Sequence, residues 1–176
     1  MRNIEIKARL HDSDAARAAA RRLADSPQTL ELEQTDTYFH VPHGRLKLRE
    51  ERGSAAAHHL VFYHRPDQPG PKQCEYSLVP VPDPEAMKSL LAAALGVRVV
   101  VDKQRIVYFH KNVRMHLDRV RDLGEFLEFE AVMSPDTPEV HGEPLVRRLM
   151  HEFAIADDDL IHVSYCDMLL QKQGEP

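Results

Sequence analysis

Residues 3–10 read Asn-Ile-Glu-Ile-Lys-Ala-Arg-Leu and alternate strictly between apolar and polar side chains. Because successive side chains of a β-strand point to opposite faces, this stretch predicts a strand with one apolar and one charged face. The apolar face would carry Ile4, Ile6, Ala8 and Leu10, and the charged face Asn3, Glu5, Lys7 and Arg9.

Seven further segments have strand-like patterns, and turn residues such as Pro42-His43-Gly44 separate several of them. The predicted strands after the first are 34–41, 45–52, 59–65, 72–80, 99–110, 112–119 and 125–133. Capping and stop signals predict helices over 12–24, 84–95, 143–153 and 164–171. Turn-rich loops are expected over 66–71 and 134–138. With no repeat or linker, the pattern favours one α+β domain over 1–176, built as a closed eight-stranded antiparallel β-barrel flanked by helices.

Composition narrows the class of protein. The chain has 176 residues, 43% hydrophobic and 29% charged, as expected of a globular domain. It has no apolar run long enough to span a membrane and no apolar signal core at its start, so we expect a cytoplasmic protein without membrane contact. The net charge of −5 argues against a general nucleic-acid binder. Cys74 and Cys166 could pair, but free thiols are expected in a reducing compartment.

The polar faces of the strands show a bias in charge. Arg45, Lys47 and Arg49 share one face, with Leu46 and Leu48 on the other. Shared faces also hold Lys103 with Arg105, Arg114 with His116 and Asp118, and Glu128 with Glu130, while Arg65 ends its strand and Glu75 lies mid-strand. Solvated faces with cross-strand ion pairs are the ordinary explanation for one such strand. The same bias in several strands, with helices available to cover the apolar faces, favours a barrel with a charged interior.

Such an interior suits a polyphosphate held with a divalent metal. Converging guanidinium and ammonium groups match several phosphates better than one carboxylate. The candidate phosphate-binding cations are Lys7, Arg9, Arg45, Lys47, Arg49, Arg65, Lys103, Arg105 and Arg114. Glu5, Glu128 and Glu130 offer the hard oxygen ligands that Mg²⁺ takes beside phosphate oxygens. The eleven histidines do not suggest zinc, because His151-Glu152 lacks a second histidine one turn on.

The order of these motifs resembles that of CYTH domains, the triphosphate tunnel metalloenzymes, and is most similar to the class IV adenylyl cyclase branch. The motifs are Glu5-Ile6-Lys7, Leu46-Lys47-Leu48-Arg49, Lys103-Gln104-Arg105, Arg114-Met115-His116-Leu117-Asp118 and Gly124-Glu125-Phe126-Leu127-Glu128-Phe129-Glu130. The resemblance implies an eight-stranded antiparallel tunnel, dependence on Mg²⁺ or Mn²⁺, and often a homodimer.

The resemblance also implies roles for individual residues. Glu5 and Lys7 match the last two positions of the family's Glu-x-Glu-x-Lys signature, and Asn3 departs from it at the first. The implied metal ligands are Glu5, Glu128 and Glu130. The implied phosphate-binding cations are Lys47, Arg49, Arg65, Lys103, Arg105 and Arg114. Glu75 and Asp118 match further acidic positions of the tunnel. Lys7, Arg114 and Asp118 are the expected catalytic residues. Because the Asn3 side chain carries no charge, it weakens the case for a second metal site.

Three activities stay open at this point. The first is cyclisation of ATP to cyclic AMP and pyrophosphate; the second is hydrolysis of tripolyphosphate or thiamine triphosphate; the third is binding of a nucleotide or polyphosphate without turnover. No adenine pocket is evident in the sequence. Tyr38, Phe39, Phe62 and Tyr63 could stack on a base, although aromatic residues on strands more often serve packing.

Overall fold

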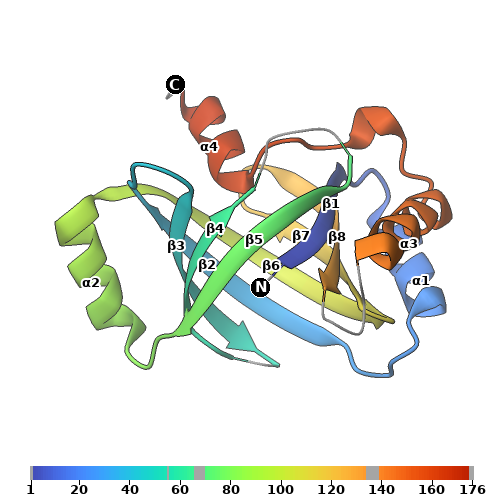
Figure 1. Ribbon diagram of the computed structural model, residues 1–176, viewed down its shortest axis with the longest axis horizontal. Helices are drawn as coiled ribbons and strands as arrows, with labels where there is room; N and C mark the ends of the chain where they lie inside the picture. Colours follow the sequence, from blue (N-terminus) through green and yellow to red (C-terminus); the bar gives the residue numbers. More distant parts are fainter. Residues whose placement is uncertain (1, 55, 66–69, 134–138, 175–176) are drawn as a thin grey trace.

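The computed structural model describes residues 2–54, 56–65, 70–133 and 139–174 (Figure 1). Its strands are β1 (Arg2–Arg9), β2 (Leu30–Phe39), β3 (Arg45–Gly53), β4 (His59–His64), β5 (Lys72–Pro80), β6 (Val97–His110), β7 (Val113–Val120) and β8 (Gly124–Met133). Its helices are α1 (Ser13–Leu23), α2 (Pro84–Leu95), α3 (Glu139–Glu152) and α4 (Tyr165–Gln173), with a short 3₁₀ turn at Asp157–Asp159.

The eight strands close into a barrel in the order β1-β5-β4-β3-β2-β6-β7-β8, and every neighbouring pair is antiparallel. The predicted fold is therefore confirmed. The largest difference among the strands is that β2 starts at Leu30, four residues before the predicted start, because Leu30 to Glu33 already pair with β6. The loop expected over 134–138 lies outside the described residues. Residues 66–69 of the loop expected over 66–71 also lie outside them.

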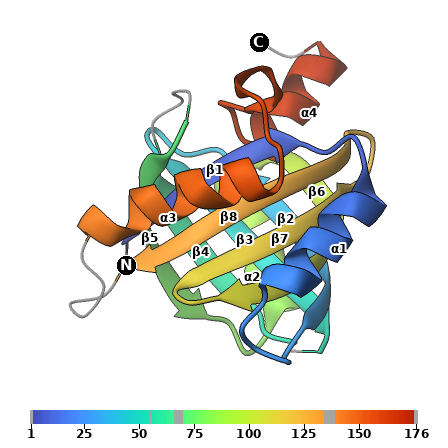
Figure 2. The same cartoon turned by 90° about the vertical axis from the view of Figure 1, so that its right-hand side faces the viewer.

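Three helices cover the outside of the barrel. α3 lies along β8 and β1, and α1 lies along β7 and β6 (Figure 2). The outward residues of these strands, such as Ile6 and Phe129, are fully buried in an apolar cluster with Val146 of α3 and Ala20 of α1. α2 packs on β2 and β3 over Phe39 and Leu48. Since β1, β7 and β8 bury their apolar faces under α1 and α3, and β3 buries its apolar face under α2, the opposite, charged faces of these strands point into the barrel.

The fourth helix closes one end of the barrel. Ser164 caps α4 through the backbone N–H of Asp167. Tyr165 and Leu169 then pack against side chains at the matching strand ends, including Tyr38, Val99, Val120 and Phe126. The opposite end has no such helix in the described part of the chain (Figure 1). The interior is thus closed at one end, which we call the α4 end, and accessible from the other, which we call the mouth.

Two further findings bear on the sequence analysis. Cys74 and Cys166 are buried and both are free, which confirms the expectation of free thiols. Burial raises the pKa of the Cys74 thiol to about 12. Among the described residues, no helix is long and apolar enough to cross a membrane.

Candidate active site

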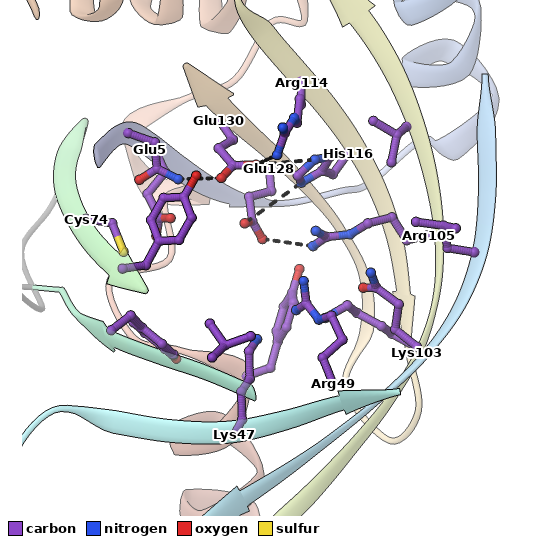
Figure 3. Close-up of a pocket in the computed structure, with 18 of the residues that line it drawn as sticks. Glu5, Lys47, Arg49, Cys74, Lys103, Arg105, Arg114, His116, Glu128 and Glu130 are labelled. Atoms are coloured by element: carbon purple, nitrogen blue, oxygen red, sulfur yellow. Dashed lines mark hydrogen bonds and ion pairs between the residues drawn. The ribbon is translucent and has the colours of Figure 1, made fainter. Parts of the chain in front are cut away.

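A cavity of about 420 Å³ runs through the inside of the barrel and is lined by residues from all eight strands and by Ser164 and Tyr165 (Figure 3). Ten of the predicted site residues line it: Glu5, Lys7, Lys47, Arg49, Arg65, Lys103, Arg105, Arg114, Glu128 and Glu130. The expected charged interior is therefore present. It contains a basic and an acidic group that face each other across the cavity, and four further cations pair with the acidic group: Lys7, Arg65, Arg105 and Arg114.

Four predicted residues lie elsewhere. Arg9 is exposed at the end of β1, with its guanidinium carbon 5.6 Å from the centroid of the Phe126 ring. Arg45 donates to Asp167 of α4 at 2.7 Å. Glu75 is exposed on the outside of β5, because its neighbour Cys74 faces inward and side chains alternate along a strand.

Asp118, the fourth, is buried behind Arg105 instead of on the cavity surface. Its two carboxylate oxygens accept from Arg105 Nε and Nη2, both at 2.6 Å, and Oδ2 also accepts from the Tyr165 hydroxyl at 3.0 Å. With 2% of its surface exposed, Asp118 can orient the Arg105 guanidinium but does not contact the cavity. The expectation that Asp118 is catalytic stays a prediction, and its position indicates that it would act through Arg105.

The first charged group, which we call the basic wall, consists of Lys47, Arg49 and Lys103 and is centred on Asp36. The Asp36 carboxylate accepts from Lys47 Nζ at 2.8 Å, from Arg49 Nε at 2.7 Å and from Lys103 Nζ at 3.0 Å. Burial would raise the pKa of Asp36, but the Arg49, Lys103 and Lys47 charges outweigh it and hold that pKa well below its usual range. One ionised carboxylate thus contacts three basic side chains and offsets part of their positive charge.

Asp36 was not among the predicted site residues. The available signal was its place in the strand alternation, two residues from Gln34 and two from Tyr38, both of which line the cavity. That alternation shows that Asp36 lies on the same face of β2 as Gln34 and Tyr38. It does not show that three cations from two other strands converge on it, since this depends on barrel closure.

Two lysines of the basic wall have altered acidity. Burial and the nearby Arg49 charge lower the pKa of Lys103 to about 7, against the opposing effect of Asp36. Burial and Arg49 likewise lower the pKa of Lys47 to about 8. Both ammonium groups are therefore held close to losing a proton at neutral pH, and a bound anion would favour their charged forms.

The second group, which we call the acidic wall, consists of Glu5 on β1 and Glu128 and Glu130 on β8. Glu5 lies directly opposite Glu130 in the β1–β8 register. Glu5 accepts from Arg65 Nη1 at 2.9 Å, and Glu128 accepts from Arg105 Nη2 at 3.3 Å. Burial and the Glu128 charge raise the pKa of Glu5. Two carboxylates held opposite each other are unfavourable unless a cation lies between them.

The acidic wall fits a hard divalent cation. Asn3 Nδ2 donates to Glu130, while Asn3 Oδ1 is buried and has no hydrogen-bond partner within the described structure. Asn3 Oδ1, Glu5 and Glu130 together offer the oxygen donors that Mg²⁺ and Mn²⁺ accept. Among the residues described, no three His, Cys, Asp or Glu side chains already stand at metal-binding positions. In this structure Glu5 and Glu130 are instead ion-paired with Arg65 and Arg114.

His116 lies between the two β8 glutamates. Its Nε2 is 3.8 Å from Glu130 Oε2 and its Nδ1 is 4.0 Å from Glu128 Oε1. Burial and the Arg105 charge hold the pKa of His116 well below its usual range, so the imidazole is neutral. The predicted shared face of Arg114 and His116 is confirmed, since both line the cavity. Arg114 lies at the mouth, with Nη1 3.4 Å from Glu130 Oε2.

Tyr165 connects α4 to the site and was missed in the sequence. Lys7 Nζ lies 3.6 Å from the centroid of the Tyr165 ring and 3.5 Å from Glu128 Oε2. The same tyrosine donates to Asp118. Burial lowers the pKa of Lys7 against the attraction of Glu128. A helix far along the chain therefore positions charged groups on β1 and β7, which strand patterns alone do not reveal.

The family model described as "CYTH domain" matches residues 1–159. Because the match covers most of the chain, the protein belongs to the CYTH domain family. Members of this family are enzymes of the adenylyl cyclase or triphosphatase type that bind triphosphates and use divalent metals. No curated protein matches the chain.

Solved structures agree with the fold. The PH1012 protein from Pyrococcus horikoshii is 24% identical, with a TM-score of 0.79, and the match covers 94% of this chain and 98% of that one. A candidate adenylate cyclase from Vibrio parahaemolyticus is 20% identical, with a TM-score of 0.74 and coverages of 95% and 97%. HpAC1 from Hippeastrum, described as having a dominant triphosphatase activity, is 16% identical, with a TM-score of 0.61 and coverages of 99% and 97%. At these identities the likeness establishes the fold alone.

Proposed function

We propose that this protein is a metal-dependent enzyme that binds ATP through its triphosphate and converts it to cyclic AMP and pyrophosphate. The observation that carries the triphosphate assignment is the pair of facing walls in one cavity, basic on β3 and β6 and acidic on β1 and β8 (Figure 3). A phosphate chain between them would contact cations on one side and a carboxylate-bound metal on the other, an arrangement that stabilises the charge developing in phosphoryl transfer.

The polarity of the tunnel supports chemistry at the α-phosphorus. Since α4 closes one end, a nucleotide would enter with its terminal phosphate first. Along β1 the order from the mouth inward is Asn3, Glu5 and Lys7, so the candidate metal ligands lie nearer the mouth than this lysine. On β8, Glu130 likewise lies nearer the mouth than Glu128. Glu5 and Glu130, which would hold the metal, thus lie toward the mouth, and this favours reaction at the α-phosphate over reaction at the γ-phosphate.

The chain's own groups then have distinct tasks. Lys47, Arg49 and Lys103 would hold the β- and γ-phosphates, and thereby the charge of the pyrophosphate that leaves. Arg105, fixed by Asp118, would bind an oxygen of the α-phosphate. A divalent ion held by Glu5 and Glu130 supplies Lewis-acid stabilisation of phosphate charge. In the reaction, the ribose 3′-oxygen would bond to the α-phosphorus, the bond to the α,β-bridging oxygen would break with pyrophosphate leaving, and the 3′-hydroxyl proton would pass to solvent water.

The decisive experiment is to incubate the protein with ATP, and separately with tripolyphosphate, in Mg²⁺ or Mn²⁺, and to identify the products. Cyclic AMP with pyrophosphate supports the proposal. Orthophosphate from either substrate, without cyclic AMP, would replace cyclisation by triphosphate hydrolysis at the same site. Tight binding with neither product would indicate a binding protein and would contradict an enzymatic role.

A further inference from the structure

One buried side chain of the tunnel has no task in the proposed reaction. His116 on β7 lines the cavity, and only 3% of its surface is exposed. In the register of β7 and β8 it lies directly opposite Glu128, and Glu130 is two residues further along β8. The imidazole therefore lies between two carboxylates of the acidic wall (Figure 3).

These two carboxylates do not hydrogen-bond to the ring. Nδ1 lies 4.0 Å from Glu128 Oε1 and Nε2 lies 3.8 Å from Glu130 Oε2, and both distances are too long for a hydrogen bond. Nδ1 is buried and has no hydrogen-bond partner within the described part of the chain. Because an unsatisfied buried polar atom is costly, a role as a hydrogen-bonded spectator, which is the ordinary explanation of a buried histidine, does not fit His116.

The spacing of these atoms suits two ligands of one metal ion. Two ligand atoms that each lie about 2.1 Å from an ion are about 3.0 Å apart at right angles and about 4.2 Å apart on opposite sides of it. The 3.8 Å between His116 Nε2 and Glu130 Oε2 falls between these limits. At this separation the two atoms do not contact each other, but an ion between them would contact both.

A second unsatisfied atom lies next to the same carboxylate. Asn3 Nδ2 donates to Glu130 Oε1, whereas His116 faces Oε2, the other oxygen of that group. Asn3 Oδ1 is buried and, among the described residues, has no hydrogen-bond partner. Glu5 is directly opposite Glu130 in the β1–β8 register. Three consecutive strands of the barrel, β1, β8 and β7, thus bring an amide oxygen, two carboxylates and an imidazole to one part of the tunnel wall.

We propose that His116 Nε2 is a nitrogen ligand of the divalent metal held by Glu5 and Glu130, and that Glu128 orients the ring without contacting the ion. The inference rests on the proposed function, which supplies the metal at these two glutamates. Nδ1, the ring nitrogen nearer Glu128, then carries the proton and directs it toward that carboxylate. A metal-bound histidine usually donates its other ring N–H in this way, because the hydrogen bond fixes the tautomer and the ring orientation.

The ion pairs of the two β8 glutamates agree with this division. Glu128 Oε2 lies 3.5 Å from Lys7 Nζ and 3.3 Å from Arg105 Nη2, and both cations are buried. Glu130 is instead paired with Arg114, whose side chain is 46% exposed. An exposed ion pair contributes little stability, so Glu130 can exchange its partner for a metal more readily than Glu128 can. Glu128, which the family resemblance implies as a ligand, is therefore assigned to the outer position.

A nitrogen ligand affects which ion the site prefers. Mg²⁺ is a hard cation that takes oxygen ligands, whereas imidazole nitrogen suits transition metals. A site that includes His116 should therefore favour Mn²⁺ over Mg²⁺ more strongly than a site made of oxygen atoms alone. The ratio of the two affinities thus depends on one side chain of β7.

The test detects the metal–nitrogen contact directly. Mn²⁺ is added to the protein with tripolyphosphate, which contains no nitrogen, and electron spin echo envelope modulation is recorded. We expect modulation from a directly bound ¹⁴N. Protein made with histidine that carries ¹⁵N in its ring should show ¹⁵N coupling in its place. Because this measurement uses the wild-type chain, it does not depend on the folding of any variant.

One variant and one matched control assign the signal to a residue. His116→Gln should abolish the ¹⁴N modulation and weaken Mn²⁺ binding, measured by calorimetry, by about tenfold or more, with a smaller effect on Mg²⁺ binding. His59→Gln is the control, because His59 also lines the cavity but belongs to β4, four strands away from β7 in either direction around the barrel. The control should keep both the modulation and the affinity for Mn²⁺.

The outcomes separate this inference from the proposed function. Bound Mn²⁺ without nitrogen modulation, or modulation that persists in His116→Gln, would overturn the ligand assignment, while formation of cyclic AMP would still support the proposed function. Loss of the modulation in His59→Gln would also overturn the assignment. Failure of the wild-type protein to bind Mn²⁺ would overturn both the inference and the metal dependence. Modulation lost in His116→Gln alone would establish the nitrogen ligand.

Discussion

Asp36 is the single residue on which the basic wall depends. It is 1% exposed, and its two carboxylate oxygens accept hydrogen bonds from Lys47, Arg49 and Lys103. A buried ion pair contributes little net stability, but removing one partner leaves charges without compensation. The carboxylate therefore keeps three cations at fixed positions in an empty tunnel.

We expect Asp36→Asn to destabilise the protein by about 3–5 kcal/mol, because three buried cations would lose their counter-charge. Urea denaturation followed by circular dichroism measures this change. Tripolyphosphate should restore part of the lost stability, since it offers the cations another anion. If the variant is as stable as the wild type, the cations do not depend on Asp36.

The acidic wall predicts a sharp contrast between two glutamates. Glu130→Gln should lower metal-dependent turnover of ATP by at least about 100-fold while leaving the thermal midpoint within a few degrees, because the amide has lost the charge that holds the metal. Glu75→Gln is the control, since Glu75 is exposed on the outer face of β5. Equal activities of the two variants would argue against a metal at Glu130.

The lysine pKa values predict a dependence of binding on pH. The pKa values of Lys103, about 7, and Lys47, about 8, lie below their usual range, so the empty site has lost protons at pH 8 that a polyanion would restore. Binding of tripolyphosphate at pH 8 should therefore take up about one proton, and affinity should fall as pH rises through this region. Calorimetry in two buffers of different ionisation enthalpy measures the uptake, and zero uptake would contradict the lowered pKa values.

At the scale of elements, α4 turns an open barrel into a tunnel with one entrance. Its first residue, Tyr165, contacts the Lys7 ammonium through its ring and Asp118 through its hydroxyl. The family match ends at residue 159, before this helix begins. α4 provides both a cover and two positioning contacts for the strands of the barrel.

Tyr165 allows the two contacts to be separated. Tyr165→Phe keeps the ring over Lys7 and loses the hydrogen bond to Asp118, so we expect a loss of about 1 kcal/mol of stability. Tyr165→Leu also removes the ring, adding the loss of the cation–π contact, and should weaken triphosphate binding further. Urea midpoints and calorimetry measure the two effects. Equal behaviour of both variants would show that the ring contact does not position Lys7.

At the scale of the whole molecule, the tunnel balances much of its own charge. Seven Lys and Arg side chains and four glutamates line the cavity in the described structure, and Asp36 and Asp118 lie just behind the lining. The sequence analysis predicted nine converging cations, with a polyphosphate to complement them beside the carboxylates. The structure instead leaves Arg9 and Arg45 off the cavity lining and adds Asp36, so fewer cations in the tunnel lack a nearby counter-charge.

Anion binding should therefore be separable from metal binding. With the metal removed by a chelator, tripolyphosphate should still raise the melting temperature by roughly 5–10 °C at about 100 times its dissociation constant, because the basic wall needs no metal. Turnover should be abolished under the same conditions. If sodium sulfate at equal ionic strength produces the same shift, the effect is nonspecific and the basic wall is not a triphosphate site.

The sequence by itself determined the eight strands and the face on which most of the charges lie, because a two-residue period needs no partner. Ten site residues were correctly placed inside the barrel for the same reason. The order of the motifs determined the family. Only the tertiary structure decided which charges meet: Asp36 with three cations, Asp118 behind Arg105, Tyr165 against Lys7, and Glu75 outside. Closure of the barrel and the docking of α4 bring together residues far apart in the chain, and alternation along one strand carries no information on such distances.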